Sequence, residues 1–259
     1  GTRILTVDFS GDGDFTTIQD AIDEAQSRTP SASSRWLVRV APGEYQESLT
    51  LYDYIDIAGF APGHSSYLVS PGSSPAIANF ADATISNLRI GGSNDNIIQS
   101  GGSTDTLRLV KILADLEAGE DGNFLQILTG AVEIHRSYIS AQQRAAYITA
   151  GSLFAYHSIL REYNTDGDLD EYAVIDVAGA ATLEIRHSQI INEAVSGSGG
   201  AAILIQSSPT YIILHHCLFR KASGTESIAT TVTPAVYAAA CAANAAIDAA
   251  ITGTQDIQL

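Results

Sequence analysis

The sequence of 259 residues has little positive charge and no methionine. Lys and Arg number 13 against 29 Asp and Glu, which gives a formal net charge of −16. Nucleic-acid binding depends on clustered Lys and Arg, so this balance argues against a nucleic-acid partner. Because the chain has no Met of its own, we expect it to be a processed protein or a piece of a larger one.

Cysteines and long apolar runs are also scarce. Two cysteines, Cys217 and Cys241, are too few for a disulfide framework, and their spacing is not that of a zinc site. No uninterrupted apolar run reaches the roughly 18 residues of a membrane span, since the closest candidate, 235–251, is broken by Asn244 and Asp248. Hydrophobic residues nevertheless make up 45% of the chain and charged residues only 16%, a composition that excludes intrinsic disorder.

A six-residue pattern recurs between residues 83 and 220. Each copy begins and ends with an apolar residue and carries a small or apolar residue at its fourth position. The copies are Ile85–Ile90, Leu109–Ala114, Ile134–Ile139, Ala155–Leu160, Ile185–Ile190 and Leu214–Phe219. Successive copies are 21 to 30 residues apart. A period of this length, combined with strand-like alternation, is typical of a solenoid.

A second short strand repeats between these copies, at 124–128, 146–150, 172–177 and 201–206. Each rung therefore contains at least two short strands, which can bury their apolar faces only by stacking rung on rung. We predict an all-β protein with the fold of a right-handed parallel β-helix.

A helix is predicted at the N-terminal end, over residues 16–28. Four apolar residues in this segment follow the spacing i, i+3, i+4 and i+7 of an amphipathic helix. They are Ile18, Ala21, Ile22 and Ala25. We expect this helix to cover the open N-terminal end of the solenoid.

A second helix is predicted over 234–251, where the sequence is rich in Ala. Thr233 and Pro234 are typical of an N-cap followed by the first helical residue, and Gly253 is a suitable stop. We accordingly divide the chain into a β-helix domain, 1–233, and a C-terminal helix and tail, 234–259, which caps the solenoid or mediates oligomerisation.

The N-terminal quarter resembles a known family. The segments that carry the resemblance are Ser10–Asp23 (SGDGDFTTIQDAID), Ala41–Glu47 (APGEYQE) and Ile55–Gly59 (IDIAG). They are similar to the N-terminal region of pectinesterases, the pectin methylesterases of the pectin-lyase-like superfamily. Phage tail proteins with β-helix domains have similar openings. The resemblance implies a β-helix whose first rungs and cap are formed by these segments.

The catalytic elements of that family are not reproduced. The resemblance implies an acidic pair in Gln-Asp-Thr-Leu and Asp-Phe-Ile-Phe-Gly elements and an Arg in a later Gly-Arg-Pro-Trp element. Here only Asp105, in Thr104–Leu107, resembles the first element, and the sole Trp is Trp36. One carboxylate without its partner cannot divide the nucleophile and general-acid roles.

Histidines and basic residues gather at one predicted corner of the solenoid. The third positions of the six copies are Asn87, Lys111, Arg136, His157, His187 and His216, and the positions before them are Ser86, Val110, His135, Tyr156, Arg186 and His215. Five of the six histidines thus fall in two adjacent columns. The candidate binding residues are Arg136, His157, His187, His216, His135, Arg186, His215 and Tyr156.

Two roles remain open for these columns. They can form a purely structural ladder, with side chains stacked roughly 4.8 Å apart. They can also form a strip that binds an anion or a sugar carboxylate on an otherwise acidic protein. We expect no metal ion, since three imidazoles in line lack the converging geometry of a tetrahedral site. Stacking should lower the pKa values of the imidazoles and reduce stability as the pH falls.

Apolar residues also occupy columns that should face outward. Leu113, Tyr138, Ile159 and Leu218 share one column, and Phe154 and Ile213 interrupt another that is otherwise charged. Exposed apolar stripes usually mark contact surfaces, so a self-association interface along the solenoid is the preferred interpretation. Loops that fold back over this face, or a substrate groove, are the alternatives.

We predict a non-catalytic structural or adhesion module of a virion or extracellular surface, of the tail-fibre, spike or capsid-decoration type. Its expected partners are itself, with a trimer as one option, other surface proteins, and a polysaccharide; no cofactor is expected. The surface location is an analogy from the fold. The alternative is a carbohydrate-active enzyme, either a diverged pectinesterase or a polysaccharide lyase or hydrolase. Its candidate catalytic residues are Asp105, Asp121 and Asp176, with Arg136 or Arg186 as charge stabiliser.

Overall fold

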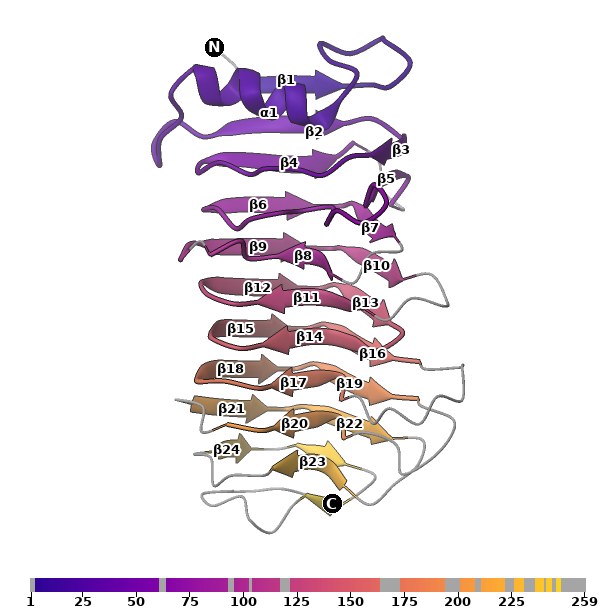
Figure 1. The fold of residues 1–259 in the computed structure, drawn as a ribbon, viewed down its shortest axis with the longest axis vertical. Coiled ribbons are helices and arrows are strands. Elements are labelled where there is room, and N and C mark those ends of the chain that lie inside the picture. Colours follow the sequence, from indigo (N-terminus) through magenta and orange to yellow (C-terminus); the bar gives the residue numbers. More distant parts are fainter. Residues whose placement is uncertain are drawn as a thin grey trace.

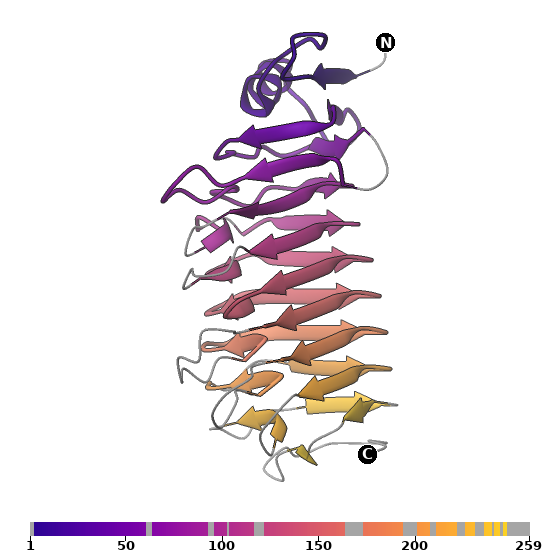
Figure 2. The same ribbon diagram turned by 90° about the vertical axis from the view of Figure 1, so that its right-hand side faces the viewer.

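The protein is a solenoid of parallel strands, shown in two views in Figures 1 and 2. The computed structural model describes residues 3–60, 64–92, 96–102, 104–116, 122–163, 173–193, 201–207, 211–221, 226–230, 236–239, 241–243 and 246–247. Within these residues the strands form three parallel sheets of ten, nine and seven strands, and the chain visits the sheets in turn. The predicted right-handed parallel β-helix is confirmed.

The first and longest sheet forms one side of the solenoid. Its strands, in order, are β1 (Ile4–Val7), β2 (Trp36–Val40), β4 (Ile55–Gly59), β6 (Ala83–Ser86), β9 (Thr106–Val110), β12 (Ala131–His135), β15 (Gly151–Tyr156), β18 (Ala181–Arg186), β21 (Tyr211–His215) and β24 (Val236–Ala239). Inward and outward side chains alternate along these strands, so one face of the sheet packs in the core and the other faces solvent.

The second and third sheets complete each rung. The second contains β3 (Gly43–Gln46), β5 (Ser66–Val69), β7 (Arg89–Gly92), β10 (Leu113–Leu116), β13 (Tyr138–Ala141), β16 (Ile159–Glu162), β19 (Gln189–Asn192), β22 (Leu218–Lys221) and β25 (Ala242–Ala243). The third contains β8 (Asn96–Gln99), β11 (Asn123–Ile127), β14 (Arg144–Ile148), β17 (Ile175–Val177), β20 (Ile203–Ile205), β23 (Glu226–Thr230) and β26 (Ala246–Ile247).

The recurring six-residue pattern marks the corner between the first and second sheets. Its third residue lies between the two strands and has a left-handed backbone in every copy. The φ angles are 54° at Asn87, 53° at Lys111, 50° at Arg136, 53° at His157, 49° at His187 and 53° at His216. Residues other than Gly, Asn and Asp rarely adopt this conformation, so the corner is a repeated local strain that the stacked rungs maintain.

In three of the six copies a buried serine hydroxyl at the fourth position of the pattern joins consecutive rungs. The Ser158 Oγ donates to the Tyr156 carbonyl at 2.9 Å and accepts the backbone N–H of Ser137, one rung earlier, at 3.2 Å. Ser137 and Ser188 repeat both bonds on their own rungs. These hydroxyls satisfy backbone groups that the turn would otherwise leave unpaired inside the protein.

The predicted N-terminal helix is confirmed as α1 (Ile18–Ser27), with Thr17 as its N-cap. Its four apolar residues identified from the sequence are all buried. The helix lies at the N-terminal end of the solenoid (Figure 1). The Glu47 carboxylate also accepts hydrogen bonds from the backbone N–H groups of Ile18 and Gln19, at 2.8 and 2.9 Å. It thereby satisfies two donors of the first helical turn and places a negative charge at the positive end of the helix dipole.

The predicted C-terminal helix over 234–251 is wrong. The described residues of this segment are the strands β24, β25 and β26, which extend the three sheets by one more rung. Ala238 pairs with Leu214, which places Cys241 at the fourth position of a seventh copy of the pattern. Helix propensity of the alanines is overridden because the open edges of β21, β22 and β23 offer unpaired backbone groups.

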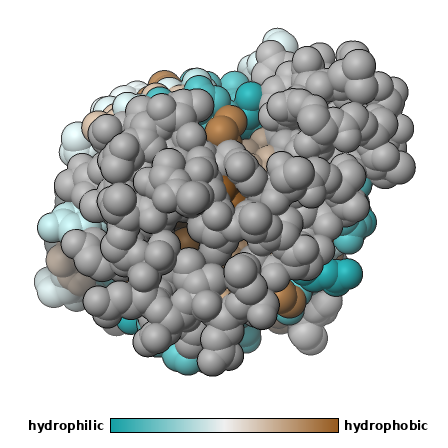
Figure 3. All heavy atoms as spheres, turned by 90° about the horizontal axis from the view of Figure 1, so that it is seen from below, coloured by the Kyte–Doolittle hydropathy of each residue, from teal (hydrophilic) through white to brown (hydrophobic). Residues whose placement is uncertain are grey.

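The core runs the length of the solenoid and consists mainly of Ile, Leu, Val and Ala. Figure 3 views the molecule from its C-terminal end, where the coloured residues at the rim are largely hydrophilic and hydrophobic ones are visible further in. No helix in the described part of the chain is long and apolar enough to cross a membrane.

The left-handed corner predicts an unusual order of stability among variants of Lys111. Lys111→Gly should leave the free energy of unfolding within about 1 kcal/mol of the parent, whereas the β-branched Lys111→Val should lower it by about 2 kcal/mol. Urea denaturation measures both. At Thr182, inside β18, the order of the two variants should reverse: Thr182→Gly should lower the free energy of unfolding more than Thr182→Val, since strands favour Val over Gly. The same order at both sites would contradict a left-handed corner.

Candidate functional site

An open groove of about 650 Å³ lies on the outward face of the first sheet, beside the corner. Four of the candidate binding residues line it: His135, Arg136, Tyr156 and His157. The other lining residues are Thr84, Arg108 and Val110. The remaining candidates, His187, Arg186, His215 and His216, lie on the two following rungs, as the pairing of β15 with β18 and of β18 with β21 shows.

Two stacked rings form one wall of the groove. The His135 and Tyr156 rings lie 4.9 Å apart between centroids, with an interplanar angle of 23°. Val110 precedes His135 in this column, and this short side chain leaves space for the groove on that side. The Tyr156 hydroxyl lies 3.2 Å from Glu184 Oε1. Burial raises the pKa of Tyr156, and the charge of Glu184 adds to this effect.

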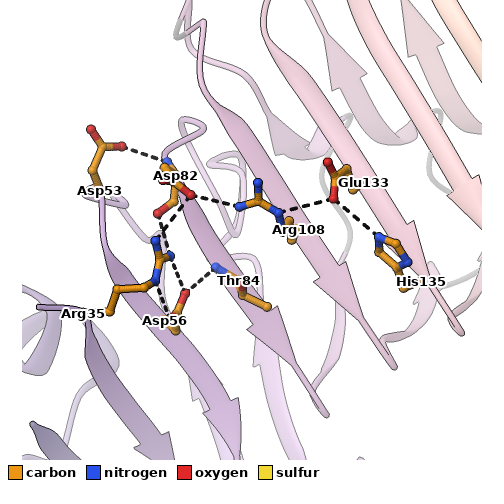
Figure 4. Close-up of polar contacts among 8 residues, drawn as sticks. All are labelled: Arg35, Asp53, Asp56, Asp82, Thr84, Arg108, Glu133 and His135. Atoms are coloured by element: carbon orange, nitrogen blue, oxygen red, sulfur yellow. Dashed lines mark hydrogen bonds and ion pairs between the residues drawn. The ribbon is translucent and has the colours of Figure 1, made fainter. Parts of the chain in front are cut away.

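A chain of ion pairs neutralises much of the positive charge on this face (Figure 4). Arg108 contacts Asp82 at 2.9 Å and Glu133 at 3.3 Å, and Glu133 in turn lies 3.5 Å from His135 Nε2. Asp82 continues the chain to Arg35 on the N-terminal side. Arg108 is therefore engaged and is a poor anion ligand, and Glu133 also contacts the His135 ring.

Arg136 is the cation that the groove leaves unengaged. Its side chain is exposed and makes no ion pair or hydrogen bond with any other residue in the described ranges, and the same is true of Lys111 one rung earlier. Arg136 lines the groove, and Lys111 does not. An exposed guanidinium beside a stacked ring pair suits a ligand that carries both a carboxylate and a flat or ring-shaped apolar face.

The histidine column continues below the groove as a stack of imidazoles. His157 and His187 are stacked at 5.1 Å with an interplanar angle of 12°, and His187 and His216 at 4.8 Å with an angle of 8°. His187 therefore lies between two rings. Loss of contact with water lowers its pKa, and the neighbouring His216, His157 and His215 lower it further.

The candidate catalytic carboxylates are not brought together. Asp105 is exposed in the turn before β9, whereas Asp176 is buried in β17 of the third sheet. Counted from β8 to β17, they are about three rungs apart, which is about 14 Å along the axis alone. Asp121 lies outside the described residues. Arg136, at the corner of the first and second sheets, and Arg186, which pairs with Glu184 at 2.6 Å, do not contact Asp176.

Asp176 instead pairs with Arg144, a residue that the sequence did not single out. Arg144 Nε lies 3.2 Å from Asp176 Oδ2, and Gln206 Nε2 donates to the same oxygen at 3.3 Å. Asp176 is 1% exposed although it shares an outward column with Gln126 and Tyr147. Burial raises its pKa, and the charge of Arg144 opposes this effect only in part.

The candidate interface residues are in register but only half-exposed. Tyr138 pairs with Leu113 on one side and Ile159 on the other, while Gln189 separates Ile159 from Leu218. Phe154 and Ile213 flank Glu184 in the first sheet. All six are intermediate in exposure. The large, strongly exposed hydrophobic residues of the described chain are Phe9, Phe60 and Tyr211, outside these columns.

Comparison with known proteins extends the fold assignment. A search of solved structures aligns the whole chain with 91% of the pectin methylesterase of Aspergillus niger, at a TM-score of 0.58 and 13% sequence identity. The chain has the pectin-lyase-like β-helix fold. At this identity the likeness concerns the fold alone.

Other comparisons add nothing to that assignment. The A-modules of the mannuronan C-5 epimerases AlgE4 and AlgE6 of Azotobacter vinelandii align with 93% of this chain at TM-scores of 0.31 and 0.29, with 12% and 10% identity. These alignments span 86% of the AlgE4 module and 84% of the AlgE6 module. No protein-family model and no curated protein matches the sequence.

The buried pair of Asp176 and Arg144 predicts opposite effects for two variants. The pKa of Asp176 is raised above its ordinary value of 3.8. The contribution of this group to the free energy of unfolding is therefore fully present below pH 3.8 and is lost as the pH rises through the raised pKa. Asp176→Asn should therefore leave the free energy of unfolding at pH 7 unchanged or higher. Arg144→Met, which isolates the carboxylate, should lower it by about 3 kcal/mol.

Urea denaturation at pH 7 decides between these outcomes, with Asp12→Asn, at an exposed site in the N-terminal loop, as the control that should change nothing. A larger loss for Asp176→Asn than for Arg144→Met would contradict the assignment of Asp176 as a destabilising buried charge.

The lowered pKa of His187 predicts a loss of stability on acidification. The His187 imidazole binds its proton less tightly in the folded protein than in the unfolded chain. The free energy of unfolding is therefore unaffected by this group above the ordinary pKa of 6.5 and falls as the pH drops below it. Melting temperatures between pH 7.5 and 5.5 should fall less in His187→Asn than in the parent. His64→Asn, also at a left-handed position but outside the stack, should follow the parent. Parallel curves for the parent and His187→Asn would count against the stack.

Proposed function

We propose that this chain is a non-catalytic β-helix module of a virion or extracellular surface that binds an acidic glycan in the corner groove. The observation that carries the proposal is the exposed guanidinium of Arg136, which has no partner among the described residues and lines the same groove as the stacked rings of His135 and Tyr156. Glycan sites commonly combine such a ring with a cation that donates hydrogen bonds to the sugar carboxylate. A β-helix offers the rigid surface on which such a site is held.

The charge distribution supports an anionic ligand at this position. The chain as a whole carries a formal charge of −16, which repels polyanions from most of its surface. Outside the groove lining, the nearby carboxylates Asp82 and Glu133 are already engaged with Arg108, so they do not oppose a bound carboxylate with their full charge. Arg136 then provides a local positive site on an acidic protein.

Self-association along the solenoid is part of the same proposal. The column of Leu113, Tyr138, Ile159 and Leu218 runs parallel to the axis on the second sheet, and a second copy or another surface protein could cover it. Stripes of this kind are typical of contact surfaces. Measurement of the molecular mass in solution should give a homo-oligomer, and a monomer at all concentrations would contradict this part.

A carbohydrate-active enzyme is the competing function. Asp105 and Asp176 lie on different rungs and in different surroundings, so neither is placed to complete a pair of acid and base. The proposal therefore predicts binding without turnover. Release of methanol from methylated pectin, or of unsaturated sugars from polyuronates, would overturn the non-catalytic assignment.

Binding of an oligogalacturonate, measured by calorimetry, tests the groove. Arg136→Gln removes one charge-assisted contact and should weaken binding about tenfold. Lys111→Gln is the matched control, because it removes the same charge from the same column outside the groove, and it should change affinity less than twofold. A neutral oligosaccharide of similar length should bind more weakly to the parent.

Two results would contradict the groove as the binding site. One is equal weakening by both variants, which would indicate diffuse electrostatic attraction. The other is the absence of binding to any acidic oligosaccharide at millimolar concentration.

A further inference from the structure

Three imidazoles meet on two adjacent rungs near the C-terminal end of the solenoid. His187 occupies the corner after β18, His215 ends β21, and His216 occupies the corner after β21. One ring nitrogen from each residue lies within 4.8 Å of the corresponding atoms of the other two. His187 and His216 are exposed and His215 is half-buried, so the cluster is open to solvent.

The three rings do not lie in line. The expectation from the sequence that no metal binds here assumed that they would. His187 and His216 are parallel, but His215 comes from the neighbouring column. Its ring is at 80° to His187 and at 77° to His216, with centroids 6.1 and 4.1 Å apart. The perpendicular ring directs a nitrogen toward the two parallel ones, which provides the convergence that a single column lacks.

The shortest contact in the cluster is between two atoms that can both be metal ligands. The Nδ1 atoms of His215 and His216 are 2.6 Å apart, so one must carry a proton if no ion is present. Two nitrogens bound to one tetrahedral zinc ion are about 3.3 Å apart, given Zn–N distances of about 2.05 Å. Rotation of the exposed His216 side chain can widen the separation to that spacing.

The surroundings of the cluster favour a bound cation. Arg186, the nearest cation on β18, is paired with Glu184 at 2.6 Å. The formal charge of −16 on the chain also favours a bound cation.

We propose that His187, His215 and His216 bind one divalent transition-metal ion of the class that prefers imidazole, with zinc as the probe and water in the remaining coordination positions. Imidazole ligands favour zinc, copper and nickel over magnesium or calcium. Bound there, the ion would link the rungs of β18 and β21 across the corner, where the left-handed backbone interrupts the sheet.

Calorimetric titration of the full chain, free of any affinity tag and stripped of metal, with Zn²⁺ tests the site. The parent should bind one ion. His187→Asn and His216→Asn keep a residue that tolerates the left-handed backbone, and each should weaken binding at least tenfold, as should His215→Gln. The matched control is His157→Asn, which removes a stacked imidazole from the same column outside the cluster and should change affinity less than twofold.

A second readout separates metal binding from misfolding. Saturating Zn²⁺ should raise the melting temperature of the parent and of His157→Asn but not of His187→Asn, provided that circular dichroism shows all three to be folded. Co²⁺ substitution should give the visible absorption of a nitrogen-ligated ion in the parent. Equal weakening by His157→Asn, or no stoichiometric Zn²⁺ binding below about 1 mM, would overturn the proposal.

Discussion

In the six copies of the repeat, the chain turns from the first sheet to the second through one left-handed residue. In three of them the hydroxyl that follows this residue, of Ser137, Ser158 or Ser188, bonds the rung before it. The Ser158 Oγ accepts the backbone N–H of Ser137 while it donates to its own rung. This pairing fixes the register between rungs at a point where the sheet hydrogen bonds are interrupted. Since the register is fixed, equivalent side chains stack along the axis, and the outward columns follow directly from it. The groove, the imidazole stack and the ion-pair chain all depend on this corner.

Most of the fold could be predicted because the pattern repeats. The copies from Ile85 to Phe219 mark the corner, and α1 follows from the spacing of its apolar residues. The C-terminal rung could not be recognised in the same way, because alanines fill its apolar positions and resemble a helix. The one residue that distinguishes it from a helix is Cys241, whose position in this rung is equivalent to that of Cys217 in the preceding rung. Contact with Cys241, together with burial, raises the pKa of the Cys217 thiol, and the two buried cysteines form no disulfide.

The candidate site was only partly accessible to sequence reasoning. The columns correctly grouped His135 with Tyr156 and His157 with His187, because these pairs depend on register alone. The sequence could not show that Arg108 also pairs with Asp82, or that Arg144 is the partner of Asp176, since these contacts join different columns. Arg108 and Glu133, by contrast, are register partners in one column. The orientation of the His215 ring relative to His216 likewise depends on side-chain rotamers, which the repeat does not determine.

The proposed binding functions share one structural requirement, which is that the corner residues repeat the left-handed conformation in register. The sign of the backbone φ at Arg136, His157, His187 and His216, measured by nuclear magnetic resonance in solution, tests this requirement most directly. The account predicts a positive φ at all four residues. A negative φ at any of them, with the adjoining strands still paired, would contradict it.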